Sequence, residues 1–415
     1  CATGAAVGLT YWILAKLVDP LSALVGALLM ISIPIVRLMS IMVMSNMPVF
    51  LMGLLLIFSW IHWQQNRRWG WALAMGVFAG WAAVCRPLEA MCFAMPVGLG
   101  ILLRMRQWDW PKRLATIALV IAGAAPFLTL QIVMNHNITG HWHMPAWQYY
   151  SNRDFPQTTM GFRKFDPSIR PVSKLPQKQD IYDTFVRQAV NRHQPGRILR
   201  QWLTFRGPLL AAGTMPCSIL LIFLPLGIPL CKGNWRWVVA GVLPVFIFLY
   251  TISVVYQVYY PVVVIPSVLL LVFLGIAEVS RALAAHAQLA RTMLLLWATL
   301  MACTALPEAR RAARDRLFTP TLLPQIDQWE ANYKGNRALV LFRYSRQRPI
   351  DEEPVFNTTA AWPDDARIIR AQDLGEQNQK LFEYYAGIQP DRDVFLFDEG
   401  TRNYLRLGTV AELAK

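Results

Sequence analysis

Ten apolar runs occupy most of the chain before residue 307 and limit what this sequence can fold into. The runs span residues 5–17, 21–42, 47–63, 69–84, 90–103, 114–134, 208–230, 237–255, 262–279 and 292–306. A helix of about 20 apolar residues crosses a bilayer, and several runs approach or exceed that length. The pattern predicts an all-α polytopic membrane domain with about ten transmembrane helices. The alternative is a soluble all-helical protein whose helices are buried.

The composition favours the membrane interpretation. Hydrophobic residues make up 55% of the 415 residues and charged residues 16%, whereas soluble domains carry about 25% charged residues. We attribute the formal net charge of +15 to basic loops that fix orientation, since no nucleic-acid or zinc signature accompanies it. The six cysteines form no disulfide framework, and most fall in or beside apolar runs, where a small buried side chain is the usual role.

The connections between the runs predict which side of the membrane each one faces. Basic residues fall on alternate connections: Lys16, Arg67, Arg68, the run 104–113, Lys232, Arg236, Arg281 and Arg291. The positive-inside rule places these connections in the cytoplasm. The turn "CRPLE", the loop 135–207 and the tail after Pro307 are then expected on the outer side.

Two domains are predicted, a transmembrane domain over 1–306 with its outer loop 135–207, and an extracytoplasmic α/β tail domain over 307–415. In the tail, "ALVLFRY" and "DVFLFDE" are typical of short buried strands, and "ARIIR" is a candidate third strand. The stretch "EQNQKLFEYYAG" predicts a helix. Because the tail has no glycine-rich phosphate loop and no nucleophile motif, we expect it to serve packing or recognition.

Two charges interrupt the apolar sequence in "VCRPLEAMCF" and mark the first candidate site. A charge at membrane depth is costly and normally faces a cavity or a partner. Arg86 offers a planar fork of donors that suits phosphate. Glu89 follows three residues later and shares roughly one helix face with it. The pair is interpreted as a phosphate clamp held by its carboxylate; a structural ion pair, or an arginine that extends to the interface, is the alternative.

Four further residues are candidates for the same outward-facing polar pocket. Arg37 lies in the outer half of its run, and Asn46 lies in the turn "MSNMP". Tyr259 and Tyr260 belong to the third outer turn, "VYQVYYP". The alternatives are interfacial extension for Arg37, a helix cap for Asn46 and an aromatic anchor for the tyrosines.

The long loop 135–207 contains two further motifs. His136, His141 and His143 are candidate metal ligands, but a His-x-His pattern without a carboxylate is weak evidence for a metal site. The stretch "ILRQWLTFRG" mixes apolar and basic residues. It predicts either a helix in the lipid headgroup layer or a loop helix that packs on the protein.

Five stretches, in this order, resemble those of a known family. The first two are "AAVGLTYWILAKLVDPLSALVGALLMISIP" and "GVFAGWAAVCRPLEAMCFAMPVGLGILLR", followed by "NHNITGHWHMPAWQYY", "YQVYYPVVVIPSVLLL" and "VFNTTAAWPDDARIIRAQDLG". In GT-C superfamily glycosyltransferases, the first stretch is similar to the second and third membrane helices, and the second stretch to the later helix pair with its Arg-Pro turn. The third is similar to the start of the central outer loop and the fourth to the last outer turn. The fifth is similar to the outer tail. The resemblance is to the bacterial branch of protein mannosyltransferase-like (glycosyltransferase family 39-like) proteins, and it covers nearly the whole chain.

The resemblance implies that the transmembrane domain is GT-C-like and that the protein is a glycosyltransferase of the bacterial inner membrane. It would transfer a hexosyl or pentosyl group from a polyprenyl-phosphate donor to a glycan, lipid or protein acceptor on the outer face. Arg86 would match the basic turn residue that neutralises the lipid phosphate, and Tyr259 and Tyr260 would border the same cavity.

The same resemblance leaves the catalytic residue unnamed. The family's catalytic base is an acidic residue in the first outer loop, which would precede Cys1. The chain is therefore expected to be an N-terminally truncated, inactive form. A divalent metal is left open as a cofactor, although this chain departs from the family at "MSNMP", where many relatives carry near Asn46 an acidic residue or a histidine that could hold one.

Two other function classes compete with this interpretation. A membrane transporter or lipid flippase should show related halves, or polar residues near the bilayer midplane in interrupted helices. A non-enzymatic membrane scaffold that presents its outer domain would need no converging polar pocket. The unusual charges of this sequence lie toward one side of the predicted membrane, which favours the enzyme.

Overall fold

The computed structural model describes residues 2–42, 44–232, 235–283, 286–314, 322–346, 354–357 and 360–415. The chain forms two compact units. The helical unit comprises Cys1–Ser151, Thr158–Phe165 and Ala189–Asp315. The C-terminal unit comprises Asn152–Gln157, Asp166–Gln188 and Arg316–Lys415. Residues of the long loop thus contribute to both units.

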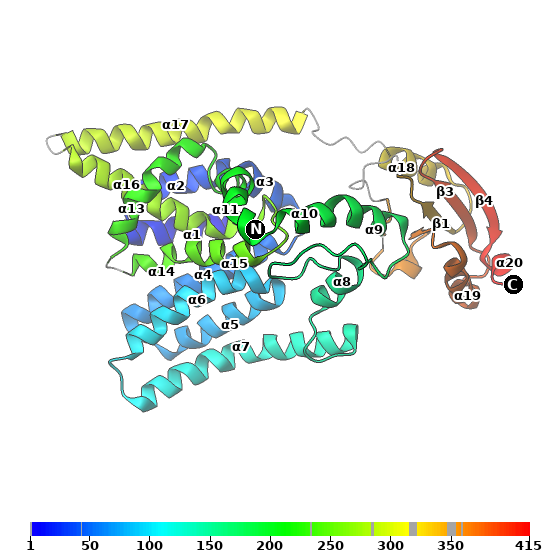
Figure 1. The fold of residues 1–415 in the computed structure, drawn as a ribbon, viewed down its shortest axis with the longest axis horizontal. Helices are drawn as coiled ribbons and strands as arrows, with labels where there is room; N and C mark the ends of the chain where they lie inside the picture. The colour runs from blue at the N-terminus through cyan, green and yellow to red at the C-terminus, as the bar shows by residue number, and fades with distance from the viewer. Residues whose placement is uncertain are drawn as a thin grey trace. The chain divides into compact units, whose positions relative to one another are not determined.

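Each of the ten apolar runs lies largely in helical structure (Figure 1). The first eight α-helices are α1 (Ala2–Leu17), α2 (Pro20–Ser32), α3 (Pro34–Ile41), α4 (Asn46–Asn66), α5 (Trp69–Cys85), α6 (Pro87–Met105), α7 (Trp110–Thr139) and α8 (Ala146–Asp154). Those that follow are α9 (Pro176–Ile181), α10 (Arg187–Arg192), α11 (Ile198–Gln201), α12 (Gly207–Thr214), α13 (Leu224–Gly227), α14 (Arg236–Ala240), α15 (Val242–Ile252), α16 (Ile265–Ala282) and α17 (Ala287–Arg314).

Among the described residues, four helices are long and apolar enough to cross a membrane. They are Asn46–Asn66, Pro87–Met105, Trp110–Thr139 and Tyr260–Ala282. Two further pairs of helices are long and apolar enough only when each pair is counted as one span. The pair Pro20–Ser32 and Pro34–Ile41 is bent by 67°, and the pair Pro195–Thr214 and Ser218–Cys231 is bent by 101°. Over the residues that the structure describes, it therefore supports four to six spans, and the ten predicted are not confirmed. Breaks at prolines and shorter apolar helices such as α5 account for the difference.

Proline sets the start of several of these helices. Pro20, Pro34 and Pro87 each stand in the first turn of a helix, where a missing backbone N–H costs nothing. The residue before proline is driven out of the helical region. Ile33 accordingly has ψ 121° and separates α2 from α3.

Glycine permits a close helix crossing in the helical unit. A Cβ atom at Gly76 on α5 would lie 2.0 Å from the carbonyl oxygen of Val120 on α7, and one at Gly123 would lie 2.2 Å from that of Leu73. Gly80 follows Gly76 by four residues and faces the same helix. Small residues at this spacing let helix backbones approach each other in membranes. The crossing fixes α5 against α7, which run side by side in Figure 1.

The C-terminal unit contains a four-stranded sheet in the order β2-β1-β3-β4. The strands are β1 (Ala338–Arg343), β2 (Ile368–Gln372), β3 (Asp393–Asp398) and β4 (Asn403–Thr409). β1 pairs in parallel with β2 and β3, and β4 is antiparallel to β3. The strands predicted at "ALVLFRY", "ARIIR" and "DVFLFDE" are confirmed, as is the helix before β3, α19 (Asn378–Ile388). β4 was not predicted.

Both faces of β1 are buried, which explains its continuous apolar sequence. Leu339 and Leu341 belong to one apolar cluster, whereas Val340 and Phe342 belong to another, together with Ile326 of α18 (Leu323–Asn332). A central parallel strand covered on both sides is typically apolar throughout rather than alternating.

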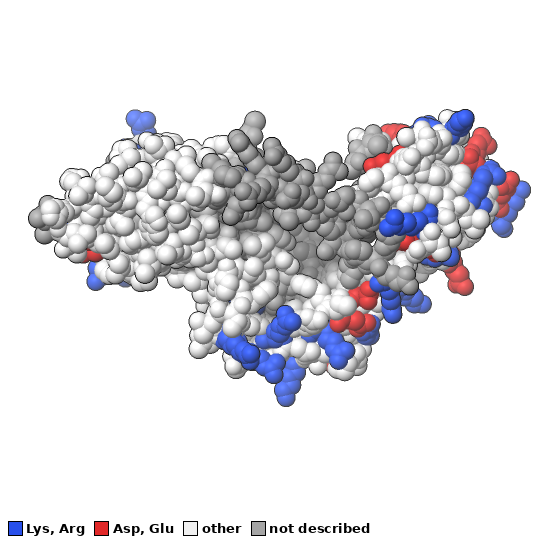
Figure 2. Space-filling model, turned by 90° about the horizontal axis from the view of Figure 1, so that it is seen from above, with Lys and Arg blue, Asp and Glu red and all other residues white. Residues whose placement is uncertain are grey.

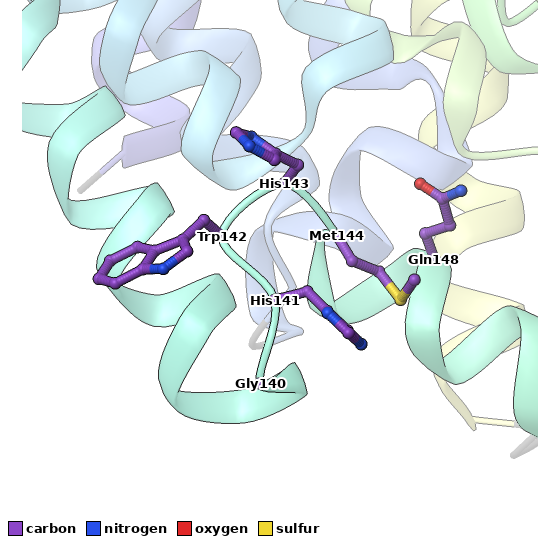
Figure 3. Close-up of a pocket in the computed structure, with 6 residues that line it drawn as sticks. All are labelled: Gly140, His141, Trp142, His143, Met144 and Gln148. Carbon is purple, nitrogen blue, oxygen red and sulfur yellow. The ribbon is translucent and has the colours of Figure 1, made fainter.

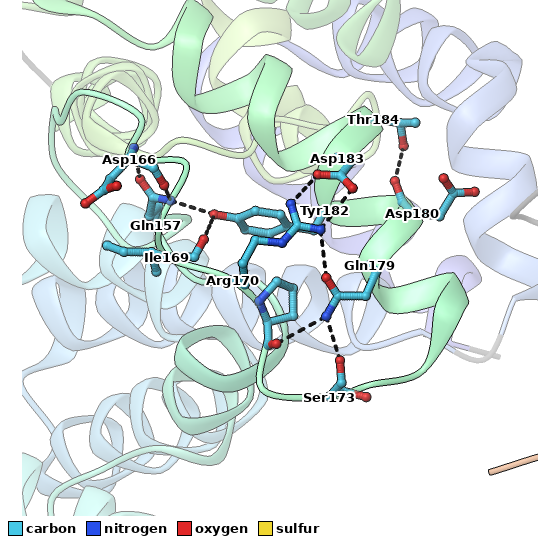
Figure 4. A network of polar contacts seen from close by, with 11 residues as sticks. Gln157, Asp166, Ile169, Arg170, Ser173, Gln179, Asp180, Tyr182, Asp183 and Thr184 are labelled. Carbon is cyan, nitrogen blue, oxygen red and sulfur yellow. Dashed lines mark hydrogen bonds and ion pairs between the residues drawn. The ribbon is translucent and has the colours of Figure 1, made fainter. Parts of the chain in front are cut away.

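Residues 166–188 of the long loop are built into the C-terminal unit. Gln177 Nε2 donates to Gln372 Oε1 at 2.7 Å, and the Tyr344 hydroxyl donates to Asp180 Oδ2 at 2.9 Å. A polar network orders the segment itself (Figure 4), in which Arg170 Nη2 donates to Asp183 Oδ2 at 3.0 Å and the Tyr182 hydroxyl donates to the Ile169 carbonyl at 2.6 Å.

The two units differ in surface charge. In Figure 2 most of the visible surface of the helical unit carries no charged side chain, whereas Lys, Arg, Asp and Glu crowd the C-terminal unit. Large apolar side chains such as Ile121 and Leu130 of α7 are exposed. An apolar exposed surface of this kind is typical of a protein that faces lipid.

Candidate functional site

The turn at Arg86 joins two apolar helices and is fixed by the residue that follows. Arg86 ends α5 and precedes α6, with φ −156° and ψ 97°. Pro87 excludes a helical conformation for Arg86 and begins the next helix. The Arg86 backbone N–H still donates to the Ala82 carbonyl at 2.8 Å, which is the last helical hydrogen bond of α5. The guanidinium is thereby held at a helix junction rather than on a free loop.

Three different elements contact the Arg86 side chain. Its Nε donates to Glu89 Oε1 at 2.6 Å, and its Nη1 donates to Asn46 Oδ1, at the start of α4, at 3.4 Å. The guanidinium carbon lies 5.0 Å from the centre of the Tyr260 ring. The arginine side chain remains 20% exposed, whereas that of Glu89 is 3% exposed. The cation is therefore oriented by buried partners and still accessible to an anion.

Glu89 has a second donor that sequence reasoning missed. The Tyr250 hydroxyl on α15 donates to Glu89 Oε1 at 2.9 Å. A buried carboxylate must be paired and hydrogen-bonded to offset its loss of hydration. Arg86 and Tyr250 together meet that need, so Glu89 balances the charge of the arginine. The signal for Tyr250 was a tyrosine hydroxyl within the apolar run "VFIFLYTI", which needs a partner when buried.

Tyrosines surround this cluster. The Tyr250 ring lies 5.1 Å from Tyr260 and 5.6 Å from Tyr256, and Tyr259 lies 4.9 Å from Tyr260. Edge-to-face and offset arrangements at such distances are favourable for aromatic rings. Tyr259 thus joins the site through the Tyr260 ring.

The structure brings five of the six sequence-predicted site residues together, directly or through one ring: Asn46, Arg86, Glu89, Tyr259 and Tyr260. Arg37 is the exception. It lies on α3, and within the described residues no hydrogen bond or ion pair connects its side chain to the cluster. Its Nη1 is buried without a hydrogen-bond partner in the described structure. Arg37 therefore stays a separate candidate.

A second buried arginine lies next to the same tyrosines. Arg206 is 2% exposed and donates to the carbonyl oxygens of Tyr250 and Ser253 and to His193 Nδ1, the last at 3.1 Å. Its guanidinium carbon is 5.6 Å from the Tyr256 ring. These acceptors are all neutral, which suits a structural role. This burial supports the packing alternative for Arg206 in "ILRQWLTFRG", although Leu199 and Leu203 remain exposed.

Burial and the neighbouring cation change the acid–base behaviour of His193. Loss of hydration, followed by the charge of Arg206, lowers the pKa of His193 to about 4. The neutral ring is the form that can accept the hydrogen bond from Arg206. His193 is therefore neutral at physiological pH and holds the loop against the buried arginine.

The histidines of the long loop do not converge. A pocket of about 430 Å³ is lined by Gly140, His141, Trp142, His143, Met144 and Gln148. Figure 3 shows that the rings of His141 and His143 point in different directions. The His136 ring stacks on Trp142 with centroids 4.0 Å apart. Within the described residues, no group of three or more His, Cys, Asp or Glu side chains could hold a metal ion.

Comparison with known proteins adds no assignment. No protein-family model, curated protein or solved structure matches this chain.

Proposed function

We propose that this protein is a membrane glycosyltransferase that binds a polyprenyl-phosphate sugar donor at the Arg86 cluster. The observation that carries the proposal is a partly exposed guanidinium, oriented by buried Glu89 and Asn46, at the junction of two apolar helices. Such a fork can bind two phosphate oxygens at once. A lipid phosphate is the anion expected at the end of apolar helices. The order of sequence motifs that resemble GT-C enzymes supports the sugar-transfer chemistry.

In the proposed reaction, an acceptor hydroxyl oxygen forms a bond to the anomeric carbon of the sugar. The bond between that carbon and the phosphate oxygen breaks, and the polyprenyl phosphate leaves with the electron pair. Arg86 would stabilise the negative charge that develops on this leaving group. The acceptor proton goes to a general base, and we assign that role to no residue of this chain. Glu89 is already bonded to Arg86 and Tyr250, so it is better suited to orient the arginine.

Sidedness belongs to the same proposal. The alternating basic connections support an outward-facing Arg86 turn and an extracytoplasmic C-terminal unit in a bacterial inner membrane. The acceptor would then be a glycan, lipid or protein of the outer face. Membrane-impermeant labelling of single cysteines, one next to Arg86 and one at the carboxyl terminus, tests this arrangement. Labelling of only one of them in intact cells would contradict it.

The binding experiment uses polyprenyl phosphate itself as the probe and purified protein in nanodiscs. Arg86→Ala would leave the Glu89 carboxylate buried without its cation, and that change alone costs about 3–5 kcal/mol. The double variant Arg86→Gln, Glu89→Gln removes both charges and avoids this loss of stability. We expect it to insert and accumulate normally and to bind the probe at least about tenfold more weakly, a loss of about 1.4 kcal/mol. Unchanged binding would contradict the phosphate-clamp role.

A transferase and a carrier are separated by a second measurement. The protein is incubated with polyprenyl-phosphate hexoses and pentoses together with glycan, lipid and protein acceptors, and release of free polyprenyl phosphate is followed. A transferase releases it in a manner that depends on Arg86. One structural observation favours the alternative of a transporter or flippase, namely the two bent helix pairs, because discontinuous helices are common in transporters. Movement of labelled lipid across proteoliposomes without release of phosphate would support that alternative.

A further inference from the structure

A second pocket lies where α4 ends and α5 and α7 begin. It has a volume of about 340 Å³, and its lining includes Trp63, Arg67, Ala72, Gln107, Trp108, Lys112 and Thr116. Its volume lies in the range of small-molecule sites. Trp63, Ala72 and Thr116 are buried, whereas Arg67 and Lys112 are exposed. The pocket thus combines a buried floor with two cations at its rim.

Arg113 fixes the turn that forms one wall of this pocket. Its Nε donates to the Trp108 carbonyl at 2.6 Å, and its Nη2 donates to the Arg106 carbonyl at 2.9 Å. The Trp108 ring lies 5.3 Å from the Trp63 ring, and the Arg67 guanidinium carbon lies 5.4 Å from the Trp108 ring. A wall held in this way is preorganised, which lowers the entropy that a ligand must offset on binding.

Arg67 occupies a backbone conformation that rarely accepts an arginine. It ends α4 with φ +50° and ψ 26°, in the left-handed region. Glycine is the usual residue at such a helix end, because other side chains are strained there. Residues held in unfavourable backbone conformations cluster at ligand-binding positions. The arginine is thus present where glycine would give the more stable turn.

The chemistry of the pocket points to an anionic amphiphile. The lining contains two cations, Arg67 and Lys112, and the Gln107 amide, but only one carboxylate, that of Asp109. The ion pair between Asp109 and Lys112, at 3.6 Å, is exposed to solvent and therefore weak. Tryptophans at the ends of apolar helices are typical of the level of lipid headgroups. We propose that this pocket binds the phosphate of an anionic phospholipid headgroup between Arg67 and Lys112, with the tryptophan rings against its glycerol.

This pocket is distinct from the Arg86 cluster. Arg68 and Arg86 stand at opposite ends of α5, a helix of 17 residues, so roughly 25 Å separates the two levels. The inference does not depend on the proposed sugar transfer, because its measurements involve only phospholipid.

The experiment compares three variants of the full chain in nanodiscs, with phosphatidylglycerol as the probe. Arg67→Gly with Lys112→Gln removes both cations and relieves the strained turn. We expect it to bind phosphatidylglycerol about tenfold more weakly in native mass spectrometry. Its melting temperature in phosphatidylcholine nanodiscs should equal or exceed that of the parent. The conservative variant Arg67→Lys, Lys112→Arg should retain binding within about twofold.

The matched control is Arg68→Gln with Arg106→Gln. It removes the same charge from the same end of the helices, but neither residue lines the pocket. Equal loss of phosphatidylglycerol binding in the control and in the Arg67→Gly, Lys112→Gln variant would overturn the proposal in favour of a diffuse basic surface. Glycerol 3-phosphate is the water-soluble arm, and we expect it to leave the melting temperature unchanged. Phosphatidylglycerol should raise the melting temperature of the parent protein. If glycerol 3-phosphate raises it by the same amount, the assignment to a lipid is overturned.

Discussion

Where α5 meets α7 in the helical unit, backbone lies against backbone at Gly76 and Gly123. In the C-terminal unit, a long charged side chain fills the corresponding role. Arg392 is 1% exposed and donates to the carbonyl oxygens of Ala338 and Ala366 at 2.8 and 3.2 Å. Lipid gives apolar helices little reason to associate, so close packing of small residues must hold them. A buried cation is a second way to hold backbone segments together, provided that its donors are satisfied, and Arg206 plays this part in the helical unit as Arg392 does in the C-terminal unit.

The largest effect is expected at the glycine crossing. In Gly76→Ala the new methyl group would meet the Val120 carbonyl oxygen at 2.0 Å, and backbone cannot move aside as a side chain can. We expect a loss of about 4 kcal/mol or more, because α5 and α7 must separate. The same change at Gly98, which has nothing within 4 Å of its Cβ position, is the control. Thermal unfolding in detergent, followed by size exclusion, measures both. Equal melting temperatures would show that the crossing is not tight.

The second prediction concerns the buried arginine of the C-terminal unit. Arg392→Met keeps much of the side-chain volume but removes the guanidinium that donates to the carbonyls of Ala338 and Ala366. We expect a loss of roughly 3 kcal/mol. Hydrogen-exchange mass spectrometry on the full chain should show faster exchange in β1 and β3 and unchanged exchange in α5 and α7. Faster exchange in both units would contradict the separation into two units.

The third prediction is that the stability of the two units depends differently on pH. The pKa of His193 in the helical unit is lowered to about 4, so the folded state binds this proton less readily than the unfolded state. Stability from the neutral ring is complete above about pH 6.5 and is lost as the pH falls towards 4. Hydrogen exchange around residues 189–206 should therefore accelerate over that range, and His193→Gln should remove this pH dependence.

The C-terminal unit should tolerate the same acidification. The pKa of Asp373 and the pKa of Asp393 are both lowered, although burial acts in the opposite direction. Hydrogen bonds from Arg343 and Asn378 lower the pKa of Asp373. Hydrogen bonds from Tyr333 and Arg406 lower the pKa of Asp393. A lowered carboxylate pKa stabilises the folded state above the unfolded value near 3.8. That stability is lost only as the pH falls further. Loss of protection in β3 already near pH 6 would contradict this assignment.

The smallest effect is expected where the loop joins the C-terminal unit. Tyr344→Phe removes one hydrogen bond to Asp180 and should cost about 1 kcal/mol. Exchange should increase in residues 166–188 only. Tyr384→Phe, which removes a hydrogen bond to Asp364 elsewhere in this unit, is the control. If both variants alter the loop equally, the loop segment is not held by Tyr344.

Local features of this chain could be predicted from its sequence, because they depend on neighbouring residues. The apolar runs become helices, and the three-residue spacing of Arg86 and Glu89 lets them pair, although Arg86 precedes α6 instead of sharing a helix face with Glu89. The sharp bend after Ser32 follows from Pro34, yet it changes the number of spans that length alone suggested. β4 was missed because "NYLRLGT" has an exposed, largely non-apolar pattern typical of an edge strand.

Contacts between distant residues could not be predicted in this way. Tyr250 reaches Glu89 across 161 positions, and no local pattern encodes such a pairing. Arg206 was interpreted as one charge of an amphipathic helix, but its burial depends on carbonyls that the turn after α15 presents. The glycines of α5 and α7 were visible in the sequence, but their role depends on which helices cross.

The division of the long loop between two units has a consequence for the order of biosynthesis. A ribosome completes residues 166–188 long before it reaches β1, and domains generally form as their parts emerge. Gln177 cannot bind Gln372, and Asp180 cannot bind Tyr344, until these later residues have been translated. The C-terminal unit is thus assembled from an early and a late portion of the nascent chain, with four of the ten apolar runs, all within residues 208–306, translated in the interval.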